Sequence, residues 1–474
     1  REDQHARFRR SALMGHSDLV IVSNRGPLSF GKDDQGNLVT SRGAGGLVSC
    51  LAPAVAGSGA TWVAGAISEE DREAASQGVV EAEGFRLRSL VIEPDDYRQF
   101  YDVVSNSTLW FLHHNLFDLP RRPRIDRRWR EAWSTFVDVN RSFAEAVAEE
   151  APDGGVVLVH DYQLCLVGTT LAKVRPDLRT AHFNHTPFCE PTTLRTLPDE
   201  VATEVMEGLA GNGACGFHAK RWARAFENCA EATLESVPPT FVAPAGIDTD
   251  DLAQVAGSDE GKEEFAKLDE QVGDRHLIAR IDRIELSKNI LRGFLAFEEL
   301  LHTRPEWRER VIFGAFVYPS RDSIPDYMAY RSEVESMVER INNTWSTPSW
   351  TPVLAYMEDF FPRSVAAHRR YDVLLVNPIR DGLNLVAKEG PTLNERDGVL
   401  VLSRESGVWD EMGESAVGIN PFDISATADA LARALSMGRR ERAERASRLR
   451  AISESRSPQA WLEDQLDAAR APSA

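Results

Sequence analysis

Short apolar segments recur along the chain, each separated from the next by a stretch long enough for an amphipathic helix. Six are clear, at 19–22, 156–159, 180–183, 276–279, 311–316 and 373–376. They are too short to be buried helices, and their Val, Ile and Leu content is typical of strands covered on both faces. Strands of this kind that alternate with helices predict an α/β fold with doubly wound parallel sheets.

The stretches between these segments have helical periodicity. Apolar residues between 290 and 301 lie on one face of a helix that Ser287 can cap, and 130–150 and 425–452 are also helical. The pair Pro238-Pro239 interrupts the pattern. We therefore expect a boundary between two α/β halves within 236–243.

Charge and cysteine content exclude several classes of function. The chain has 54 Lys and Arg but 73 Asp and Glu, and its net charge of −19 is unfavourable for binding nucleic acid or an anionic membrane. Five cysteines, none spaced as CxxC, argue against a disulfide framework or a structural zinc and for a reduced cytosolic compartment. The uncharged stretch 43–67 contains Gly and Pro, so we expect a Gly-rich loop, a helix and a buried strand there, not a membrane span.

Polar side chains follow each of the six predicted strands. They are Ser23, Asn24 and Arg25; His160 and Asp161; Asn184 and His185; Arg280, Asp282 and Arg283; Tyr318 and Arg321; and Asn377, Arg380 and Asp381. One polar strand end means little, because loops are polar anyway. Six together predict a ligand site, since ligands of parallel sheets bind at the carboxyl ends of the strands.

Three loops open onto predicted helices. The Gly-rich turn 43–46 allows backbone N–H groups to approach a phosphate or sugar, although its spacing is not GxGxxG and a plain tight turn is an equal alternative. The loops 287–289 and 381–385 open two more helices, and Arg283 and Lys288 beside the first would suit a pyrophosphate. The alternative is a pair of solvated cations with ordinary caps. Asp248-Thr249-Asp250 does not follow a strand, and we expect no metal site there.

These segments together resemble the trehalose-6-phosphate synthase family. The resemblance covers roughly 18–466, and its most specific part is Pro-Ile-Arg-Asp-Gly-Leu-Asn-Leu-Val-Ala-Lys-Glu at 378–389. The other matching strings are Val22-Ser23-Asn24-Arg25, Gly45-Gly46-Leu47-Val48, Ser105-Asn106 with Leu109-Trp110, His160-Asp161-Tyr162, Asn184-His185-Thr186-Pro187-Phe188, Gly216-Phe217-His218, Pro244 with Gly246-Ile247-Asp248, and Arg283 with Ser287-Lys288.

The resemblance implies a GT-B fold, with two Rossmann-like lobes around a cleft. We expect an acceptor-side lobe at 18–240, a donor-side lobe at 241–452, and a C-terminal helix within 453–474 that crosses back to the first lobe. The implied enzyme is a cytoplasmic hexosyltransferase. It would transfer glucose, with retention, from a nucleotide-glucose to glucose 6-phosphate and form α,α-trehalose 6-phosphate. No metal or other cofactor, nucleic acid or membrane partner is implied, and a homo-oligomer is left open.

The resemblance also implies roles for individual residues. Asp161 and His185 match sugar-binding residues at the reaction centre, and Arg283 with Lys288 matches the pair that holds the donor pyrophosphate and stabilises the departing nucleotide. The remaining donor-binding positions are Gly45, Gly46, Asp381, Gly382, Leu383, Asn384, Leu385 and Glu389, the last at the ribose. The acceptor positions are Arg25, Tyr101, Trp110 and Arg321, whose two arginines would meet the phosphate of glucose 6-phosphate.

Local departures from the family pattern concern the nucleotide. The usual Arg-Leu-Asp-Tyr-Ser-Lys-Gly is Arg-Ile-Glu-Leu-Ser-Lys-Asn at 283–289, and Asn-Glu-Arg-Asp stands at 394–397. Lys-Asn at 288–289 in place of Lys-Gly, and the Asn-Glu-Arg-Asp string, are similar to actinobacterial GDP-dependent pseudo-glycosyltransferases that make validoxylamine phosphate. We therefore expect GDP-glucose as the preferred donor and UDP-glucose next, with 355–364 as the region that reads the base.

Two alternatives remain open. One is a pseudo-glycosyltransferase that couples a nucleotide-cyclitol to an aminocyclitol phosphate, although such relatives lack the Val-Ala-Lys-Glu string and the tyrosine present here at 386–389 and 101. The other is a non-catalytic sugar-phosphate sensor. The presence of Arg283, Lys288, Asp381 and Glu389 argues against it.

Overall fold

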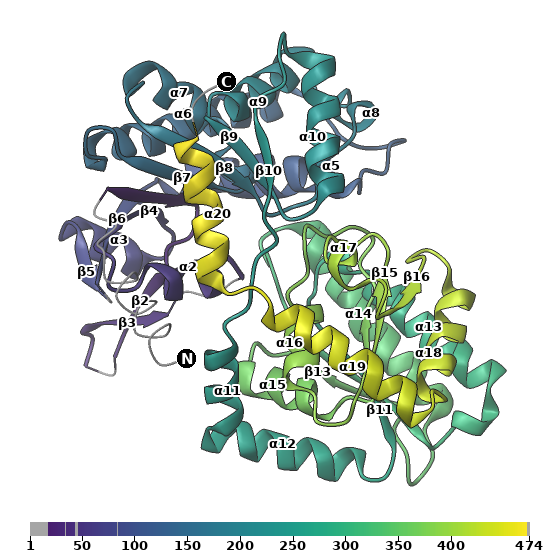
Figure 1. Cartoon of the computed structure of the whole chain (residues 1–474). Coiled ribbons are helices and arrows are strands. Elements are labelled where there is room, and N and C mark those ends of the chain that lie inside the picture. Colours follow the sequence, from purple (N-terminus) through teal and green to yellow (C-terminus); the bar gives the residue numbers. More distant parts are fainter. Residues whose placement is uncertain (1–17, 34, 43–45, 83, 472–474) are drawn as a thin grey trace. The chain divides into compact units, whose positions relative to one another are not determined.

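The computed structural model describes residues 18–471 except 34, 43–45 and 83 (Figure 1). These residues form two compact units, an N-terminal unit of 18–245 with 458–471 and a C-terminal unit of 246–457. Both contain parallel sheets, so the predicted α/β class is confirmed. The chain changes unit after residues 245 and 457, five residues beyond each of the boundaries expected at 240 and 452.

The N-terminal unit is built on an eight-stranded sheet. Its strands lie in the order β10 (Thr240–Val242), β9 (Ala214–Phe217), β8 (Arg179–Asn184), β7 (Val156–His160), β1 (Leu19–Ser23), β4 (Thr61–Ala66), β6 (Phe85–Val91) and β5 (Val80–Ala82). All neighbours are parallel except β5, which is antiparallel to β6. The three strands predicted in this unit are confirmed as β1, β7 and β8, which are adjacent. A separate hairpin, β2 (Leu28–Lys32) and β3 (Leu38–Arg42), follows β1.

Helices of the N-terminal unit connect these strands. They are α2 (Gly46–Val55), α3 (Glu69–Ser76), α4 (Pro94–Arg98), the π-helical segment η1 (Gln99–Leu109), α5 (Trp110–His114), α6 (Arg127–Glu150), the short turn η2 (Tyr162–Leu164), α7 (Val167–Val174), α8 (Pro191–Leu194), α9 (Asp199–Ala210) and α10 (Lys220–Thr233). The last helix, α20 (Pro458–Arg470), returns to this unit and packs against α2, β7 and β8 (yellow in Figure 1). Because α2 and β4 occupy the uncharged stretch, the helix and buried strand expected there are also confirmed.

The C-terminal unit has a six-stranded parallel sheet. Its order is β13 (Val353–Tyr356), β12 (Val311–Tyr318), β11 (His276–Arg283), β14 (Val373–Val376), β15 (Val399–Ser403) and β16 (Val417–Ile419). This is the third-second-first-fourth-fifth-sixth order of the doubly wound fold, and the strand order reverses between β11 and β14. The predicted strands β11, β12 and β14 are confirmed.

Helices alternate with the strands in this unit as well. They are α11 (Thr249–Gly257), α12 (Asp259–Val272), the turn η3 (Leu286–Lys288), α13 (Ile290–Thr303), the turn η4 (Pro305–Trp307), α14 (Pro325–Trp345), α15 (Phe361–Arg370), α16 (Val386–Leu393), α17 (Trp409–Met412), α18 (Ile424–Leu435) and α19 (Arg439–Glu454). One local expectation is wrong. Ser287 does not cap α13, because it lies inside η3 and Asn289 precedes the helix in a left-handed conformation.

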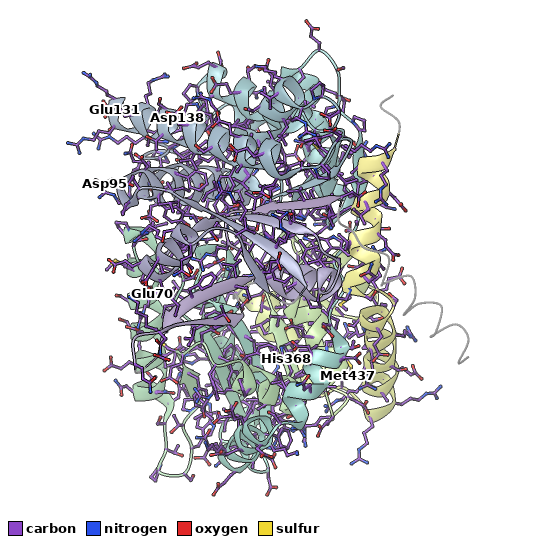
Figure 2. All side chains as sticks on the ribbon, turned by 90° about the vertical axis from the view of Figure 1, so that its left-hand side faces the viewer. Glu70, Asp95, Glu131, Asp138, His368 and Met437 are labelled. Carbon is purple, nitrogen blue, oxygen red and sulfur yellow. The ribbon has the colours of Figure 1, made fainter. Side chains whose placement is uncertain are left out.

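Several acidic side chains project from the surface of the N-terminal unit, as Figure 2 shows for Asp95, Glu131 and Asp138. Each is paired with an arginine three or four residues away, an exposed arrangement that stabilises little. Asp248 accepts from the N–H groups of Asp250 and Asp251, so it caps α11. Among the described residues, no group of three or more His, Cys, Asp or Glu could hold a metal ion, and no helix is long and apolar enough to cross a membrane.

Candidate active site

Asp161 follows β7 in a backbone conformation that almost only glycine adopts. Its φ is 72° and its ψ is 168°, a region that costs a residue with a Cβ about 1–3 kcal/mol. Three contacts with β8 and the residue after it hold Asp161 there. Its N–H donates to the Phe183 carbonyl (2.8 Å), its carbonyl accepts from His182 Nε2 (3.1 Å), and its Oδ1 accepts from the His185 N–H (3.1 Å). Strain that the surroundings enforce is typical of functional sites.

Three histidines from three adjacent strand ends form a connected row. His218 Nδ1 accepts from the Ala245 N–H at 3.3 Å, so the proton of a neutral His218 is on Nε2. That nitrogen lies 3.2 Å from His185 Nδ1, and His185 Nε2 lies 3.1 Å from His160 Nδ1. His218 therefore donates from Nε2 to His185, and His185 donates from Nε2 to His160. Both ring nitrogens of His185 are engaged inside this histidine row (His160, His185 and His218), while its backbone N–H holds Asp161.

The histidine row lies beneath the C-terminal helix, where His160 and His218 are buried and His185 is partly exposed. Trp461 of α20 is fully buried, and its ring centroid lies 6.1, 5.6 and 6.0 Å from those of His160, His185 and His218. Burial lowers the pKa of His185 to about 3 and that of His182 to about 4. Burial, with His185 beside it, also holds the pKa of His160 well below 6.5. These imidazoles are therefore neutral at physiological pH.

The predicted acceptor residues of this unit include an arginine beside a stacked tyrosine pair. The Arg25 guanidinium lies 6.0 Å from the centroid of the Tyr101 ring, and Tyr101 stacks on Tyr97 at 5.3 Å. Asn24 Nδ2 donates to the Tyr97 hydroxyl at 3.1 Å. The structure thus brings Arg25 and Tyr101 together. Tyr97 and Asn24 complete the group, and only Asn24 was visible as a strand-end residue.

Tyr101 lies in the π-helical segment η1. Three polar side chains support its wide turns, because Ser105, Asn106 and Thr108 each donate to the carbonyl five residues earlier. Tyr162, which follows β7, donates to Asn106 Oδ1 at 2.7 Å and so ties this segment to the Asp161 loop. π-Helical turns are rare and concentrate at functional sites.

Three further expected positions of this unit are Trp110, Gly46 and Gly45. Trp110 begins α5, is buried, and packs against His114 with ring centroids 4.1 Å apart. Gly46 is the first residue of α2, and Gly45 lies outside the described residues.

In the C-terminal unit, Lys288 and Asp381 meet across 93 residues of sequence. Lys288 Nζ donates to Asp381 Oδ2 at 2.6 Å and lies 4.0 Å from Asp282 Oδ1. Burial lowers the pKa of Lys288, but Asp381 and Asp282 outweigh it, and the pKa lies above its ordinary value. The ammonium group is therefore a fixed positive charge at the carboxyl end of the sheet.

Arg280 organises the backbone around Lys288, and sequence reasoning noted it only as a strand-end residue. Its side chain is fully buried and donates to Asp282 Oδ2 (3.0 Å), the Lys288 carbonyl (2.6 Å) and Asn377 Oδ1 (2.6 Å). Asn289 has φ 61°, and its Nδ2 donates to the carbonyls of Asn377 and Pro421. Asn289 thus stands where the family has glycine and holds two loops by their backbones.

Arg283 and Arg321, expected at different substrates, share one carboxylate. Arg283 Nε lies 3.2 Å and Arg321 Nη1 3.1 Å from Oε1 of Glu285, whose side chain is 2% exposed. Arg321 has φ 55° and also donates to the Tyr327 hydroxyl at 2.7 Å. In the sequence, Glu285 stands out only because the family pattern has Asp at this position.

The loop 381–385 wraps tightly in front of α16. Asn384, at φ 88°, donates to Asp381 Oδ2 at 3.1 Å and accepts from the Ala387 N–H at 3.2 Å. The Leu383 carbonyl accepts from Ser406 Oγ at 2.8 Å. Gly382 and Leu385 complete the loop, whose Asp381 carboxylate thus contacts both Lys288 and Asn384.

Glu389, one turn into α16, faces a histidine that the sequence did not single out. Its Oε2 lies 3.5 Å from Nε2 of His368, a fully buried side chain of α15. The predicted base-reading stretch 355–364 joins β13 to α15, and its Arg363 lies over the Tyr356 ring at 4.7 Å and pairs with Glu264 at 2.8 Å.

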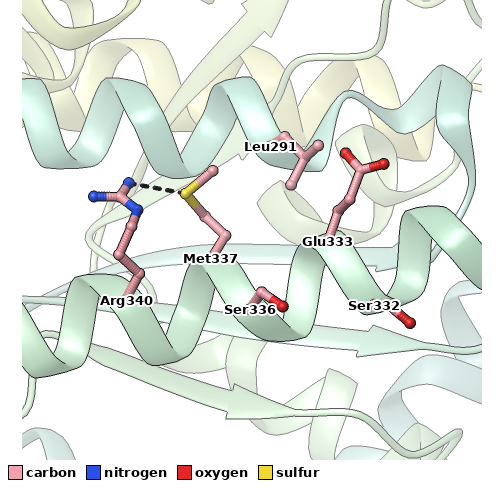
Figure 3. Close-up of a pocket in the computed structure, with 6 residues that line it drawn as sticks. All are labelled: Leu291, Ser332, Glu333, Ser336, Met337 and Arg340. Atoms are coloured by element: carbon pink, nitrogen blue, oxygen red, sulfur yellow. Dashed lines mark hydrogen bonds between the residues drawn. The ribbon is translucent and has the colours of Figure 1, made fainter.

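An open pocket of about 400 Å³ lies elsewhere on the C-terminal unit, between α13 and α14. Figure 3 shows Leu291 of α13 facing Ser332, Glu333, Ser336, Met337 and Arg340 of α14. The pocket contains none of the predicted site residues.

Comparisons with known proteins agree in one family. The model of glycosyltransferase family 20 matches residues 17–471. The trehalose-6-phosphate synthase of Mycobacterium marinum is 32% identical over 91% of this chain and 90% of its own length. The bifunctional trehalose-6-phosphate synthase/phosphatase of Thermoproteus tenax is 35% identical over 76% of this chain, which spans about half (51%) of that relative's length.

Solved structures of this kind are similar along both chains. An E. coli structure bound with UDP-2-fluoro glucose has a TM-score of 0.83 and 28% identity over 96% of this chain and 99% of its own. A UDP-forming α,α-trehalose-phosphate synthase from Burkholderia xenovorans, in complex with glucose-6-phosphate, has a TM-score of 0.84 and 27% identity over 96% and 100%. The similarity to these structures confirms the expected GT-B fold with two Rossmann-like sheets.

Proposed function

This chain belongs to glycosyltransferase family 20 and is a hexosyltransferase, and we propose that it transfers glucose from a nucleotide-glucose to glucose 6-phosphate. The product is α,α-trehalose 6-phosphate, with retention at the donor carbon. The observation that carries this proposal is the largely buried, charged Lys288 held by Asp381 at the sheet's carboxyl end. The M. marinum relative and the two solved structures bear names and ligands of the same reaction.

The donor diphosphate leaves with developing negative charge, which Lys288 and Arg283 stabilise. The bond between the glucose anomeric carbon and the diphosphate oxygen breaks, and the acceptor hydroxyl oxygen bonds to the same carbon on the same face. The hydroxyl proton passes to the departing phosphate, so no enzymic base is required. Fixed cations suit this step because they need no reorganisation as charge develops.

The remaining roles follow the chemistry of the side chains. Asp161 binds a sugar hydroxyl. His185 contributes to sugar binding indirectly, because the His185 backbone N–H holds the Asp161 carboxylate and the His185 ring is engaged in the histidine row. Arg25 in the N-terminal unit and Arg321 in the C-terminal unit are each assigned to the acceptor phosphate, and Tyr101 and Trp110 are assigned to the acceptor. Asp381 and the 382–385 backbone bind donor hydroxyls, Glu389 binds the ribose, and Gly45 and Gly46 are likewise assigned to the donor.

GDP-glucose is the preferred donor in this proposal, and UDP-glucose is next. The support is the likeness of 288–289 and 394–397 to GDP-using relatives. Asn289 and Asn394 bond backbone groups, including the Tyr371 carbonyl and the Gly398 N–H for Asn394, so they act on the base through the loops they hold. The Burkholderia structure is named UDP-forming, which makes UDP-glucose the necessary comparison.

Release of nucleoside diphosphate tests both levels of the proposal. ADP-, GDP- and UDP-glucose are supplied with and without glucose 6-phosphate, and the product is identified. Acceptor-dependent release supports the synthase, and a higher kcat/KM for GDP-glucose than for UDP-glucose supports the donor order. Equal values, or a preference for UDP-glucose, would refute the donor order alone.

Two other functions give different results in the same assay. A pseudo-glycosyltransferase would release diphosphate only with a nucleotide-cyclitol and an aminocyclitol phosphate. A sugar-phosphate sensor would bind glucose 6-phosphate without turnover. The charged Lys288–Asp381 pair favours catalysis over sensing, because a sensor has no departing nucleotide to stabilise.

A further inference from the structure

The geometry points to Glu285 as a positioning residue that couples the two phosphate subsites of the C-terminal unit. This inference rests on the proposed function, which assigns Arg283 to the donor diphosphate and Arg321 to the acceptor phosphate.

One oxygen of Glu285 gathers three donors. Its Oε1 forms ion pairs with Arg283 Nε (3.2 Å) and Arg321 Nη1 (3.1 Å) and accepts a hydrogen bond from Ser320 Oγ (3.1 Å). These donors come from the end of β11 and from the segment after β12, so a single carboxylate spans two strand ends. Because its side chain is 2% exposed, solvent screens these pairs weakly.

The two arginines differ in how firmly they are held without Glu285. Arg321 is 9% exposed and also contacts Tyr327 by a hydrogen bond at 2.7 Å and by its position over the ring at 5.2 Å. The Arg283 side chain is 45% exposed. Glu285 therefore orients a partly exposed arginine against one that is buried, and it keeps two like charges close together.

The length of residue 285 sets the spacing of that pair. The family pattern has Asp at this position, which is one methylene shorter, whereas Glu here reaches both guanidinium groups through the same oxygen. A change at 285 therefore disturbs two substrates at once. The donor effect appears in turnover through Arg283, and the acceptor effect appears in the KM for glucose 6-phosphate through Arg321.

The same sheet offers a matched control at its opposite edge. Asp372 precedes β14, is 2% exposed, and lies 3.3 Å from both Arg370 Nη1 and Arg396 Nε. It is a second buried carboxylate that gathers arginines, but it lies at the amino ends of the strands. Asp372→Asn should lower the melting temperature and leave both kinetic constants unchanged.

The test compares Glu285→Gln, Glu285→Asp and Asp372→Asn, with Glu285→Gln also built on Arg321→Ala. We expect Glu285→Gln to raise the KM for glucose 6-phosphate and to lower kcat, each at least tenfold. In Glu285→Asp, which keeps the charge, we expect one of these two changes to be smaller than in Glu285→Gln. On the Arg321→Ala background, the KM effect should disappear while the kcat effect remains. An equal KM effect on both backgrounds, tighter acceptor binding in Glu285→Gln, or changes in stability alone that match Asp372→Asn would overturn the inference.

Calorimetric titration with glucose 6-phosphate separates this inference from the proposed function. Absence of turnover in the unmodified protein with all three donors would refute the synthase. Weaker glucose 6-phosphate binding in Glu285→Gln but not in Asp372→Asn would still support the positioning role. Unchanged binding in Glu285→Gln would refute that role. If Glu285→Gln does not fold, Glu285→Asp provides the same comparison.

Discussion

The carboxyl ends of the two sheets present opposite kinds of side chain. In the N-terminal unit, β7, β8 and β9 lead into histidines, and burial lowers the pKa values of His160, His182 and His185 and keeps these three neutral. In the C-terminal unit, β11 and β14 lead into a network of full charges that includes Arg280, Lys288 and Asp381. Neutral groups of fixed tautomer can orient a side chain for sugar hydroxyls, whereas fixed charges suit phosphates.

The largest expected effect tests the charged residues at the carboxyl end of the C-terminal sheet. Lys288→Ala should lower kcat by roughly 10²–10³, the usual cost of removing one preorganised electrostatic group, with little change in acceptor KM. Steady-state kinetics on folded protein measure it, and Lys288→Arg is the charge-retaining control. An unchanged kcat with a raised acceptor KM would contradict the assignment to the leaving group.

A smaller effect is expected for Arg321, the residue at the carboxyl end of the C-terminal sheet that is assigned to the acceptor phosphate. Arg321→Ala should raise the KM for glucose 6-phosphate by about 10–100-fold, because a charge-assisted bond to phosphate contributes about 1.5–3 kcal/mol. Activity with free glucose should change little, since that acceptor has no phosphate. If both acceptors suffer equally, Arg321 contacts the sugar or supports the fold instead.

Asp161, whose backbone is strained, tests the carboxyl end of the N-terminal sheet. Asp161→Gly and Asp161→Ala should both lose activity, but the glycine variant should be more stable by about 1–3 kcal/mol, because only glycine adopts φ 72° without strain. Urea unfolding of the two variants measures this difference. Glycine normally destabilises relative to alanine, so the opposite order would show that Asp161 is unstrained.

The smallest expected effect is the pH dependence of stability that arises from the buried histidines. The folded pKa values of His182 and His185 lie below the unfolded value, so the unfolded chain binds protons first as pH falls. Stability should be independent of these groups above pH 6.5 and should fall below it, by about 1 kcal/mol per histidine at pH 5.5. Melting temperatures across pH 5–7 measure this loss. His182→Gln keeps the donor to Asp161 and should flatten part of the slope, and an unchanged slope would contradict the burial argument.

The sequence predicted the strands and helices named above and most of the polar residues at the strand ends. Local periodicity reports burial along one segment, and the carboxyl ends of parallel strands must meet, so residues such as Asp161, Lys288 and Asp381 could be named before the fold was known. The roles of Tyr97, His368 and Trp461 could not. Each lies in an ordinary helical pattern, and its importance comes only from the partner on another element.

The sequence by itself determined the alternation of strands and helices and the presence of polar residues at the strand ends. Only the tertiary structure decided what those residues do. His185 is separated from His160 by 25 residues and from His218 by 33, and the proton positions of the row follow from the Ala245 N–H at one end. Lys288 remains charged because Asp381 lies 2.6 Å away. Protonation and ion pairing depend on neighbours in space, which the order of residues along the chain does not specify.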